Sequence, residues 1–258
     1  MKKDIVIIGS GNVATHLAQA LYEKGENIVQ VYSRQLANAE LLAKRVGAEA
    51  TDCLADIVAD ADIYIISVKD DAIQSVAGAL SHVDRDSIVL HTAGSVPLTV
   101  LSSKFVNAAI LYPMQTFSKT CGLDFSSVPC FVEAYNQHTL QKVMLLARSV
   151  STRVVEADSE RRKYLHLAAV FACNMANHCY HLAECVMKEA GLDFSLLNPL
   201  IAETARKVQN MSPYDAQTGP MVRNDLSVMQ AQLSMLKDDD MRALYELMAK
   251  SIRRRHPE

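Results

Sequence analysis

The first half of the chain alternates short apolar runs with segments of helical periodicity. Residues 5–8 form a fully apolar run that is typical of a buried strand, and residues 13–24 follow with apolar positions at helical spacing. Residues 37–46 and 139–150 predict two further helices on the same criterion. The other apolar and β-branched runs predict strands at 28–32, 48–50, 62–68, 87–90, 108–112, 130–133 and 153–155. This alternation predicts an α/β domain with a doubly wound, mostly parallel sheet.

The pattern becomes purely helical after about residue 158. Residues 159–190 have helical periodicity without proline, and Gly191 stands where such a helix is expected to stop. Residues 194–208, 226–236 and 241–254 predict further helices, whereas 210–219, which contains proline and glycine, predicts a loop. We therefore expect two domains, residues 1–157 with the sheet and an all-helical C-terminal domain over residues 158–258.

Composition narrows the class of protein. Half of the 258 residues are apolar, which excludes a disordered chain, and the net charge of −3 argues against a nucleic-acid binder that relies on bulk positive charge. No apolar run approaches the about 20 residues of a membrane span, and the first strand begins too early to leave room for a signal peptide. The six cysteines contain no C-x-x-C pair, so we expect free thiols in a reducing cytoplasm; they are Cys53, Cys121, Cys130, Cys173, Cys179 and Cys185.

A glycine motif lies between the first strand and the first helix. It reads G-x-G-x-x-A and consists of Gly9, Ser10, Gly11, Asn12, Val13 and Ala14. The first glycine permits a tight turn, the second lets the backbone approach a pyrophosphate, and the alanine allows close packing of helix on strand. The N-terminus of the helix adds hydrogen-bond donors for an anion. The alternative is a tight turn without a ligand, but the strand–loop–helix position favours a dinucleotide site.

The end of the second strand distinguishes between two cofactors. NAD sites usually place an acidic residue here to bind the ribose 2′-hydroxyl, but this chain has Ser33 and Arg34. Ser33 can donate a hydrogen bond to a 2′-phosphate and Arg34 can pair with it. The sequence therefore favours NADP(H), although Arg34 as a solvated loop charge is the alternative.

Two further loops follow predicted strands and should meet the glycine loop at one edge of the sheet. The residues that we expect to contact the cofactor there, with Met114 beyond them, are Val68, Lys69, Asp70, Ile73, Thr92, Ala93, Gly94 and Met114. His91 is a candidate proton donor. The alternative is that Lys69 and His91 are ordinary loop residues and that Asp70 caps the helix that begins there.

These loops, together with residues 112–117 (YPMQTF), 166–174 (HLAAVFACN) and 218–225 (TGPMVRND), resemble a family of NADP oxidoreductases. That family joins a Rossmann-like domain to a helical domain of unknown function, and the resemblance covers nearly the whole chain. Its architecture is similar to that of pyrroline-5-carboxylate reductase, ketopantoate reductase and deazaflavin-dependent NADP oxidoreductases. The resemblance implies that the helical domain completes the active site and forms a homodimer. It implies no particular substrate.

A polar stripe lies on the long predicted helix. At about 100° per residue, His166, Asn174, Asn177 and His181 fall within roughly one quarter of the helical wheel. His166 and His181 are candidate acids, and we expect the two asparagines to orient substrate; the alternative is that these groups bond internally. Arg223 is a candidate to bind a substrate carboxylate or phosphate, or to pair with Asp225.

His178, His181 and Cys185 also stand at helical spacing, but no supporting ligands are apparent elsewhere in the sequence. We therefore expect no metal site.

The leading hypothesis is an NADP(H)-dependent oxidoreductase that transfers a hydride to or from a C=O or C=N bond of a small polar metabolite. The alternative is a catalytically inactive sensor or regulatory protein that binds NADP, since no residue is an unambiguous acid or base. We expect a small-molecule substrate and a homodimer, and neither nucleic acid nor membrane as a partner.

Overall fold

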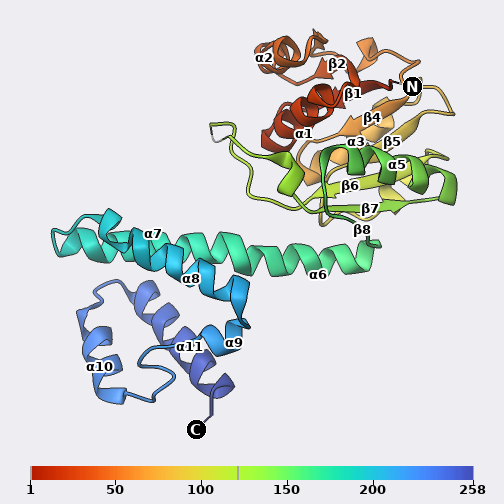
Figure 1. Ribbon diagram of the computed structural model, residues 1–258. Coiled ribbons are helices and arrows are strands. Elements are labelled where there is room, and N and C mark those ends of the chain that lie inside the picture. Colours follow the sequence, from red (N-terminus) through yellow and green to blue (C-terminus); the bar gives the residue numbers. More distant parts are fainter. Residues whose placement is uncertain (1, 121, 258) are drawn as a thin grey trace. The chain divides into compact units, whose positions relative to one another are not determined.

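The computed structural model describes residues 2–120 and 122–257, so Cys121 lies outside the described part (Figure 1). The chain divides into two compact units, Met1–Asn174 and Met175–Glu258. The sheet and the first part of the long helix belong to the first unit. The division therefore falls later than the change of sequence pattern at residue 158, because helix α6 (Ser159–Ala169) is packed with the sheet.

An eight-stranded sheet forms the centre of the first unit, in the order β3-β2-β1-β4-β5-β6-β7-β8. All described neighbours are parallel except β6 and β7, which pair antiparallel. The predicted α/β fold with a mostly parallel sheet is confirmed. Its strands are β1 (Asp4–Ile8), β2 (Asn27–Tyr32), β3 (Glu49–Thr51), β4 (Ile63–Ile66), β5 (Ile88–His91), β6 (Ala108–Pro113), β7 (Cys130–Ala134) and β8 (Val154–Glu156).

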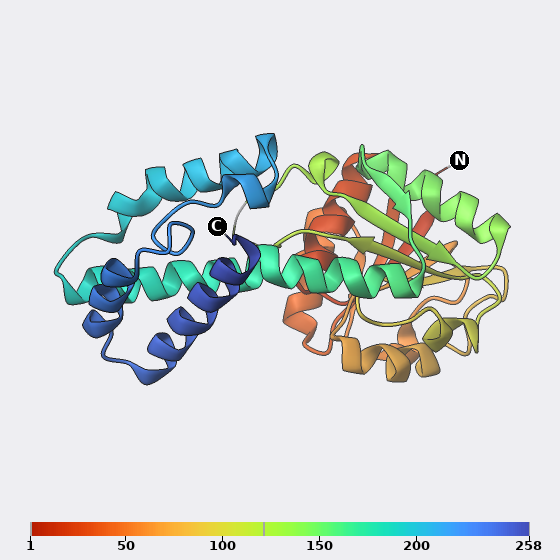
Figure 2. The same ribbon diagram turned by 90° about the horizontal axis from the view of Figure 1, so that it is seen from below.

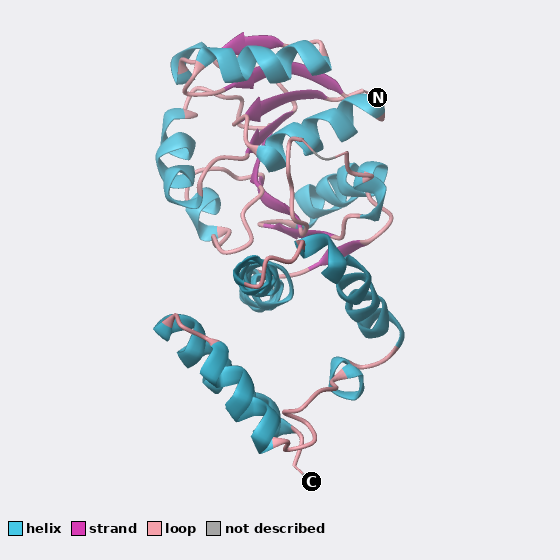
Figure 3. Cartoon of the chain, turned by 90° about the vertical axis from the view of Figure 1, so that its left-hand side faces the viewer, coloured by secondary structure: helices cyan, strands magenta, loops and turns pink. Residues whose placement is uncertain are grey.

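Helices cover both faces of this sheet, and the alternation of side chains along β1 explains why (Figures 2 and 3). Ile5 and Ile7 pack in one core with α1 (Asn12–Glu23), α2 (Leu36–Val46) and α5 (Gln137–Val150). Val6 and Ile8 point to the other face and pack with α3 (Ile73–Ala79) and α4 (Thr99–Ser102). The four successive apolar residues 5–8 of β1 are therefore buried on both sides of the sheet, as parallel sheets require.

The long helix is interrupted in its middle. Between α6 and α7 (Ala176–Glu189), the segment Val170–Met175 is π-helical. A π-helical turn holds more residues than an α-helical turn, so it rotates the residues that follow relative to those before it. The predicted polar stripe depends on a uniform spacing of about 100° per residue from His166 to His181, and this spacing does not hold across the π-helical segment.

The remaining helices are α8 (Asn198–Asn210), α9 (Pro213–Ala216), α10 (Leu226–Met235) and α11 (Asp239–Arg255). The short helix α9 lies within the segment that the sequence predicted to be a loop. Ser212 caps it by accepting a hydrogen bond from the Asp215 backbone N–H at 3.1 Å, and Pro213 occupies its first turn. Within the described ranges, no helix has the length and apolar character needed to cross a membrane.

Candidate functional site

A cleft of about 1310 Å³ opens where the parallel strands of the first unit end. Four loops contribute to it, because the carboxyl ends of β1, β2, β4 and β5 lie side by side in the sheet. All of its lining residues belong to the unit Met1–Asn174. Those that the sequence predicted are Gly9, Ser10, Gly11, Asn12, Val13, Ser33, Arg34, Val68, Lys69, Asp70, Thr92, Ala93, Gly94 and His166.

The glycine loop has the geometry of a binding turn. Gly9 has a φ of +128°, and a Cβ at this position would lie 2.1 Å from the Ser67 carbonyl oxygen. At Gly11 a Cβ would meet no protein atom within 4 Å, so the second glycine leaves open space. Helix α1 begins here without a side-chain cap and without an acidic residue in its first turn. Its N-terminal N–H groups are therefore suited to a pyrophosphate.

The end of β2 carries positive charge next to hydroxyl groups. Arg34 is exposed and lines the cleft, and the Ser10 hydroxyl donates to the Ser33 hydroxyl at 2.8 Å. Among the described residues the lining carboxylates are Asp70 and Asp71, which follow β4 and not β2. Sequence reasoning missed Gln35, Asn38 and Lys119, which also line the cleft, because no motif marks them.

A buried arginine holds the loop that follows β5. Arg162 of α6 is fully buried and donates to the carbonyl oxygens of Ala93 at 2.9 Å, Gly94 at 3.1 Å and Val96 at 3.0 Å. Its guanidinium also pairs with Glu133 at 2.9 Å. Sequence reasoning missed both residues, because Arg162 stands in a run of charged residues that predicts only a solvated helix start.

His91 is part of the interior and does not line the cleft. Burial first, and the Arg162 guanidinium second, lower the pKa of His91 to about 3, and the Pro97 carbonyl offsets this only in part. Its Nδ1 accepts a hydrogen bond from the Ala93 backbone N–H at 3.2 Å. The structure therefore argues against His91 as the proton donor, because its imidazole is not in the acidic, protonated form at neutral pH and does not reach the cleft.

His166 is the predicted acid that does reach the cleft. Its side chain is exposed, and its Nδ1 lies 3.3 Å from the Tyr112 hydroxyl. Asn174 is exposed in the π-helical segment and is not among the lining residues. Asn177 and Arg223 belong to the other compact unit, so their roles stay predictions.

Three predicted cofactor contacts do not line the cleft. Ala14 and Ile73 are each only 1% exposed, because their side chains pack into the cores on the two faces of the sheet. Met114, just beyond β6, is half-buried and does not line the cleft either. The prediction assigned whole loops to the cofactor, whereas side chains that face inward contribute packing.

The histidines of α7 make local contacts. His181 lies 3.4 Å from Glu184 and 3.9 Å from the Cys185 sulfur. Within residues 2–120 and 122–257, no three histidine, cysteine or acidic side chains are grouped so that they could hold a metal ion.

The comparison with known proteins identifies the family. A protein from Bacteroides fragilis that is assigned to the NADP oxidoreductases is 45% identical in sequence, over 98% of both chains, with a TM-score of 0.93. The chain belongs to this family of NADP oxidoreductases. The family model described as "NADP oxidoreductase coenzyme F420-dependent" matches residues 4–94, and a domain of unknown function (DUF2520) matches residues 128–252.

Two further relatives of this NADP oxidoreductase are more distant. An imine reductase from Myxococcus stipitatus, solved in complex with NADP+, shares the fold at 16% identity, over 97% of this chain and 93% of its own, with a TM-score of 0.69. The pyrroline-5-carboxylate reductase of Pseudomonas aeruginosa is 32% identical over 103 residues. That alignment covers 38% of this chain and 37% of the reductase, so the chain spans little more than a third of this curated relative.

Proposed function

We propose that this protein binds NADP(H) and transfers a hydride to or from a C=O or C=N bond of a small polar metabolite. One observation carries the proposal: a single cleft joins the uncapped N-terminus of α1, the Ser33–Arg34 pair and the imidazole of His166. An anion site, a site for a 2′-phosphate and a proton-transfer group are the three features that a reductase of this kind needs.

The residues present fit the cofactor. The backbone at Gly11 and the first turn of α1 would hold the pyrophosphate, since a Cβ-sized space is open there. Arg34 and Ser33 would bind the 2′-phosphate, the group that distinguishes NADP(H) from NAD(H). When bound, the reduced nicotinamide supplies the hydride.

The names of two similar proteins support the substrate class that we propose. The imine reductase and the pyrroline-5-carboxylate reductase are named for substrates with a C=N bond. We therefore place cyclic imines first and small keto acids second among the substrates to test. In reduction, His166 would give a proton to the substrate nitrogen or oxygen as the carbon gains the hydride.

Two measurements test this function. Calorimetric titration with NADPH and with NADH should give clearly tighter binding of NADPH. Oxidation of NADPH should then be measured against a panel of cyclic imines and keto acids, with His166→Gln as the comparison. Loss of the proton donor should lower kcat by about 10²–10⁴-fold. NADPH binding without turnover of any substrate would favour the sensor, and no NADPH binding would overturn the proposal altogether.

We also propose that the protein is a homodimer and that its helical domain forms the interface. Among the described residues of the unit Met175–Glu258, Ala249 alone is buried. Large apolar side chains there are open to solvent, including Leu200 at 64%, Met235 at 70% and Leu247 at 66%. Exposed apolar surface on this scale is typical of a surface that a partner covers.

The described cysteines are all free, which fits a reducing compartment such as the cytoplasm.

A further inference from the structure

Tyr112 and His166 form a contact that the proposed function does not yet use. Tyr112 lies in β6 and His166 in α6, and the Tyr112 hydroxyl is 3.3 Å from His166 Nδ1. The two rings meet edge to face, with centroids 6.2 Å apart and planes at 66°. His166 makes no other side-chain hydrogen bond among the described residues. One ring nitrogen is therefore held, and the other, Nε2, remains available.

A glycine makes room for this pair. A Cβ at Gly94 would lie 2.7 Å from the Tyr112 ring and 3.1 Å from His166 Nδ1. Both distances are closer than a real side chain tolerates without displacing its neighbours. The backbone of Gly94 is itself fixed, because Arg162 donates to its carbonyl oxygen at 3.1 Å. The buried ion pair with Glu133 thus secures, through Arg162, the surface against which the Tyr112–His166 pair packs.

The chemistry of Tyr112 suits a holding role. Burial raises the pKa of the Tyr112 hydroxyl above its usual value, with Arg162 acting in the opposite direction and Asp70 adding to the rise. The hydroxyl therefore stays protonated at neutral pH and does not itself release a proton. A neutral phenol can donate to an unprotonated Nδ1 and accept from a protonated one, so it can hold the ring in both protonation states of His166.

We propose that Tyr112 is a positioning residue, which holds His166 through Nδ1 so that Nε2 exchanges the proton with the substrate. The inference rests on the proposed function. In the reduction the donor is the imidazolium, whose Nδ1–H donates to the Tyr112 oxygen. Its Nε2–H bond breaks, an N–H or O–H bond forms on the substrate atom whose double bond has been reduced, and the neutral imidazole left behind takes up a proton from solvent. Bound NADPH would supply the hydride and leave as NADP+.

Tyr112→Phe tests this role, because it removes the hydroxyl and keeps the ring that packs near Phe131. Tyr135→Phe is the matched control, since Tyr135 is exposed and lies outside the cleft. We expect Tyr112→Phe to lower kcat about tenfold, as for loss of one hydrogen bond, with the KM for NADPH unchanged within about twofold. Gly94→Ala should lower kcat at least as much, because it displaces the pair. Tyr135→Phe should match the unaltered protein.

A second readout does not depend on turnover. In the free protein labelled with ¹⁵N-histidine, the His166 signals are assigned by their absence in His166→Gln. At a pH where His166 is neutral, we expect Nδ1 to have the shift of a hydrogen-bond acceptor and Nε2 to carry the proton. Tyr112→Phe should move both shifts toward the average of two tautomers.

If the tautomer is the same with and without the hydroxyl, the inference is overturned even when kcat falls, because the loss is then structural. An unchanged kcat in Tyr112→Phe, in an active enzyme, also overturns it. If no substrate in the panel is turned over, the proposed reductase function fails on its own measurement. The tautomer shift still decides whether Tyr112 holds His166.

Discussion

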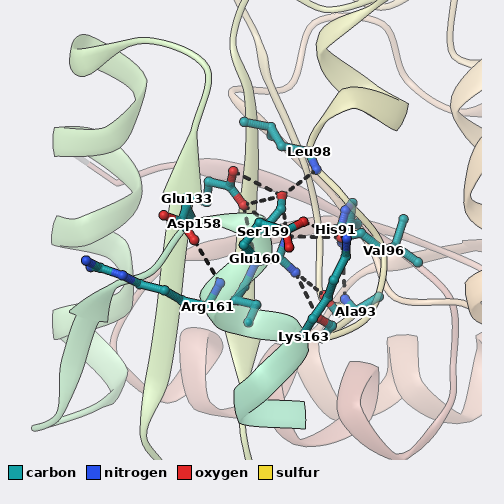
Figure 4. A network of polar contacts seen from close by, with 12 residues as sticks. His91, Ala93, Val96, Leu98, Glu133, Asp158, Ser159, Glu160, Arg161 and Lys163 are labelled. Atoms are coloured by element: carbon teal, nitrogen blue, oxygen red, sulfur yellow. Dashed lines mark hydrogen bonds and ion pairs between the residues drawn. The ribbon is translucent and has the colours of Figure 1, made fainter. Parts of the chain in front are cut away.

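Arg162 is fully buried, and its Nη2 lies 2.9 Å from the Glu133 carboxylate, whose side chain is 17% exposed. This pair joins α6 to β7, and the remaining donors of the guanidinium bond three carbonyl oxygens of the loop after β5. Ser159 completes the group by donating to Glu133 at 2.8 Å and accepting from the Leu98 backbone N–H at 3.1 Å (Figure 4). A loop that lines the cleft is therefore fixed by charge buried beneath it.

Removal of the arginine should destabilise the fold strongly. Arg162→Ala leaves Glu133 without its cation and three carbonyl oxygens without the guanidinium donor, so we expect the free energy of unfolding to fall by about 3–5 kcal/mol. Arg161→Ala is the control, because this neighbour on the same helix is exposed. Urea denaturation measures both variants. Equal midpoints for the two would show that the buried pair contributes no more than a solvated charge.

The stability of the protein should fall in mild acid because of His91. Its pKa is about 3 in the folded protein against 6.5 for an ordinary histidine, so the unfolded chain binds the proton more readily between these values. The stabilisation is present above pH 6.5 and is lost as the pH falls toward 3. Between pH 7 and pH 5 this one group should cost about 2 kcal/mol.

The variant for comparison is His91→Gln, which can accept from the Ala93 N–H but does not titrate. Denaturant unfolding at pH 7 and pH 5 should show a smaller loss in His91→Gln than in the unaltered protein, by about the same 2 kcal/mol. The other seven histidines are common to both proteins. A loss of equal size in the two would contradict the burial of a neutral His91.

Alanine substitutions at the two glycines of the motif should have different effects, one on stability and one on cofactor binding. Gly9→Ala places a Cβ 2.1 Å from the Ser67 carbonyl in a backbone with a φ of +128°, so we expect a loss of stability of about 3 kcal/mol or more. Gly11→Ala meets no protein atom, and its φ of −72° suits alanine. It should fold normally and bind NADPH at least about tenfold more weakly, because the methyl group occupies the approach to the pyrophosphate. Thermal unfolding and calorimetry separate the two effects. If Gly11→Ala binds NADPH with unchanged affinity, the assignment of the pyrophosphate to this loop is wrong.

Arg34 should select the cofactor. We expect Arg34→Ala to weaken NADPH binding by about 1.5–3 kcal/mol and to leave NADH binding nearly unchanged, because only NADPH carries the 2′-phosphate. Arg45→Ala is the control: Arg45 is exposed near the end of α2 and does not line the cleft. Calorimetric titration of both cofactors into both variants gives the four affinities. If the unaltered protein binds NADPH and NADH equally, the assignment of Ser33 and Arg34 to the 2′-phosphate is wrong.

The sequence predicted the sheet, the glycine loop and Arg34 because each depends on local pattern. Strand β1 is apolar at four successive positions, and the loop that follows it is read directly from its glycines. Contacts between residues far apart in the sequence are not marked by any local pattern. Glu133 and Arg162 are 29 positions apart, and only the packing of α6 against the sheet brings them together.

The burial of His91 and the change of phase along the long helix could not be predicted from the sequence, for a related reason. The sequence predicted a strand over 87–90 with His91 as the first residue of the loop, whereas β5 extends to His91 and all four of its residues are buried. Residue types do not mark the end of a strand closely enough to separate a core position from the loop position that follows it. Likewise, the π-helical segment changes which residues of the long helix share a face, and no residue type in 170–175 predicts that segment.

The last prediction concerns assembly. If the helical domain forms the dimer interface, light scattering at micromolar concentration should give a mass of twice 28.4 kDa. Leu200→Glu places a charge on α8 where an apolar side chain is 64% exposed, and burial of that charge in an interface would be unfavourable. We expect this variant to shift toward the monomer. Leu41→Glu is the matched control, because Leu41 on α2 is also 64% exposed but belongs to the sheet unit. A single-chain mass for the unaltered protein would contradict the homodimer, and equal masses for the two variants would contradict an interface at Leu200.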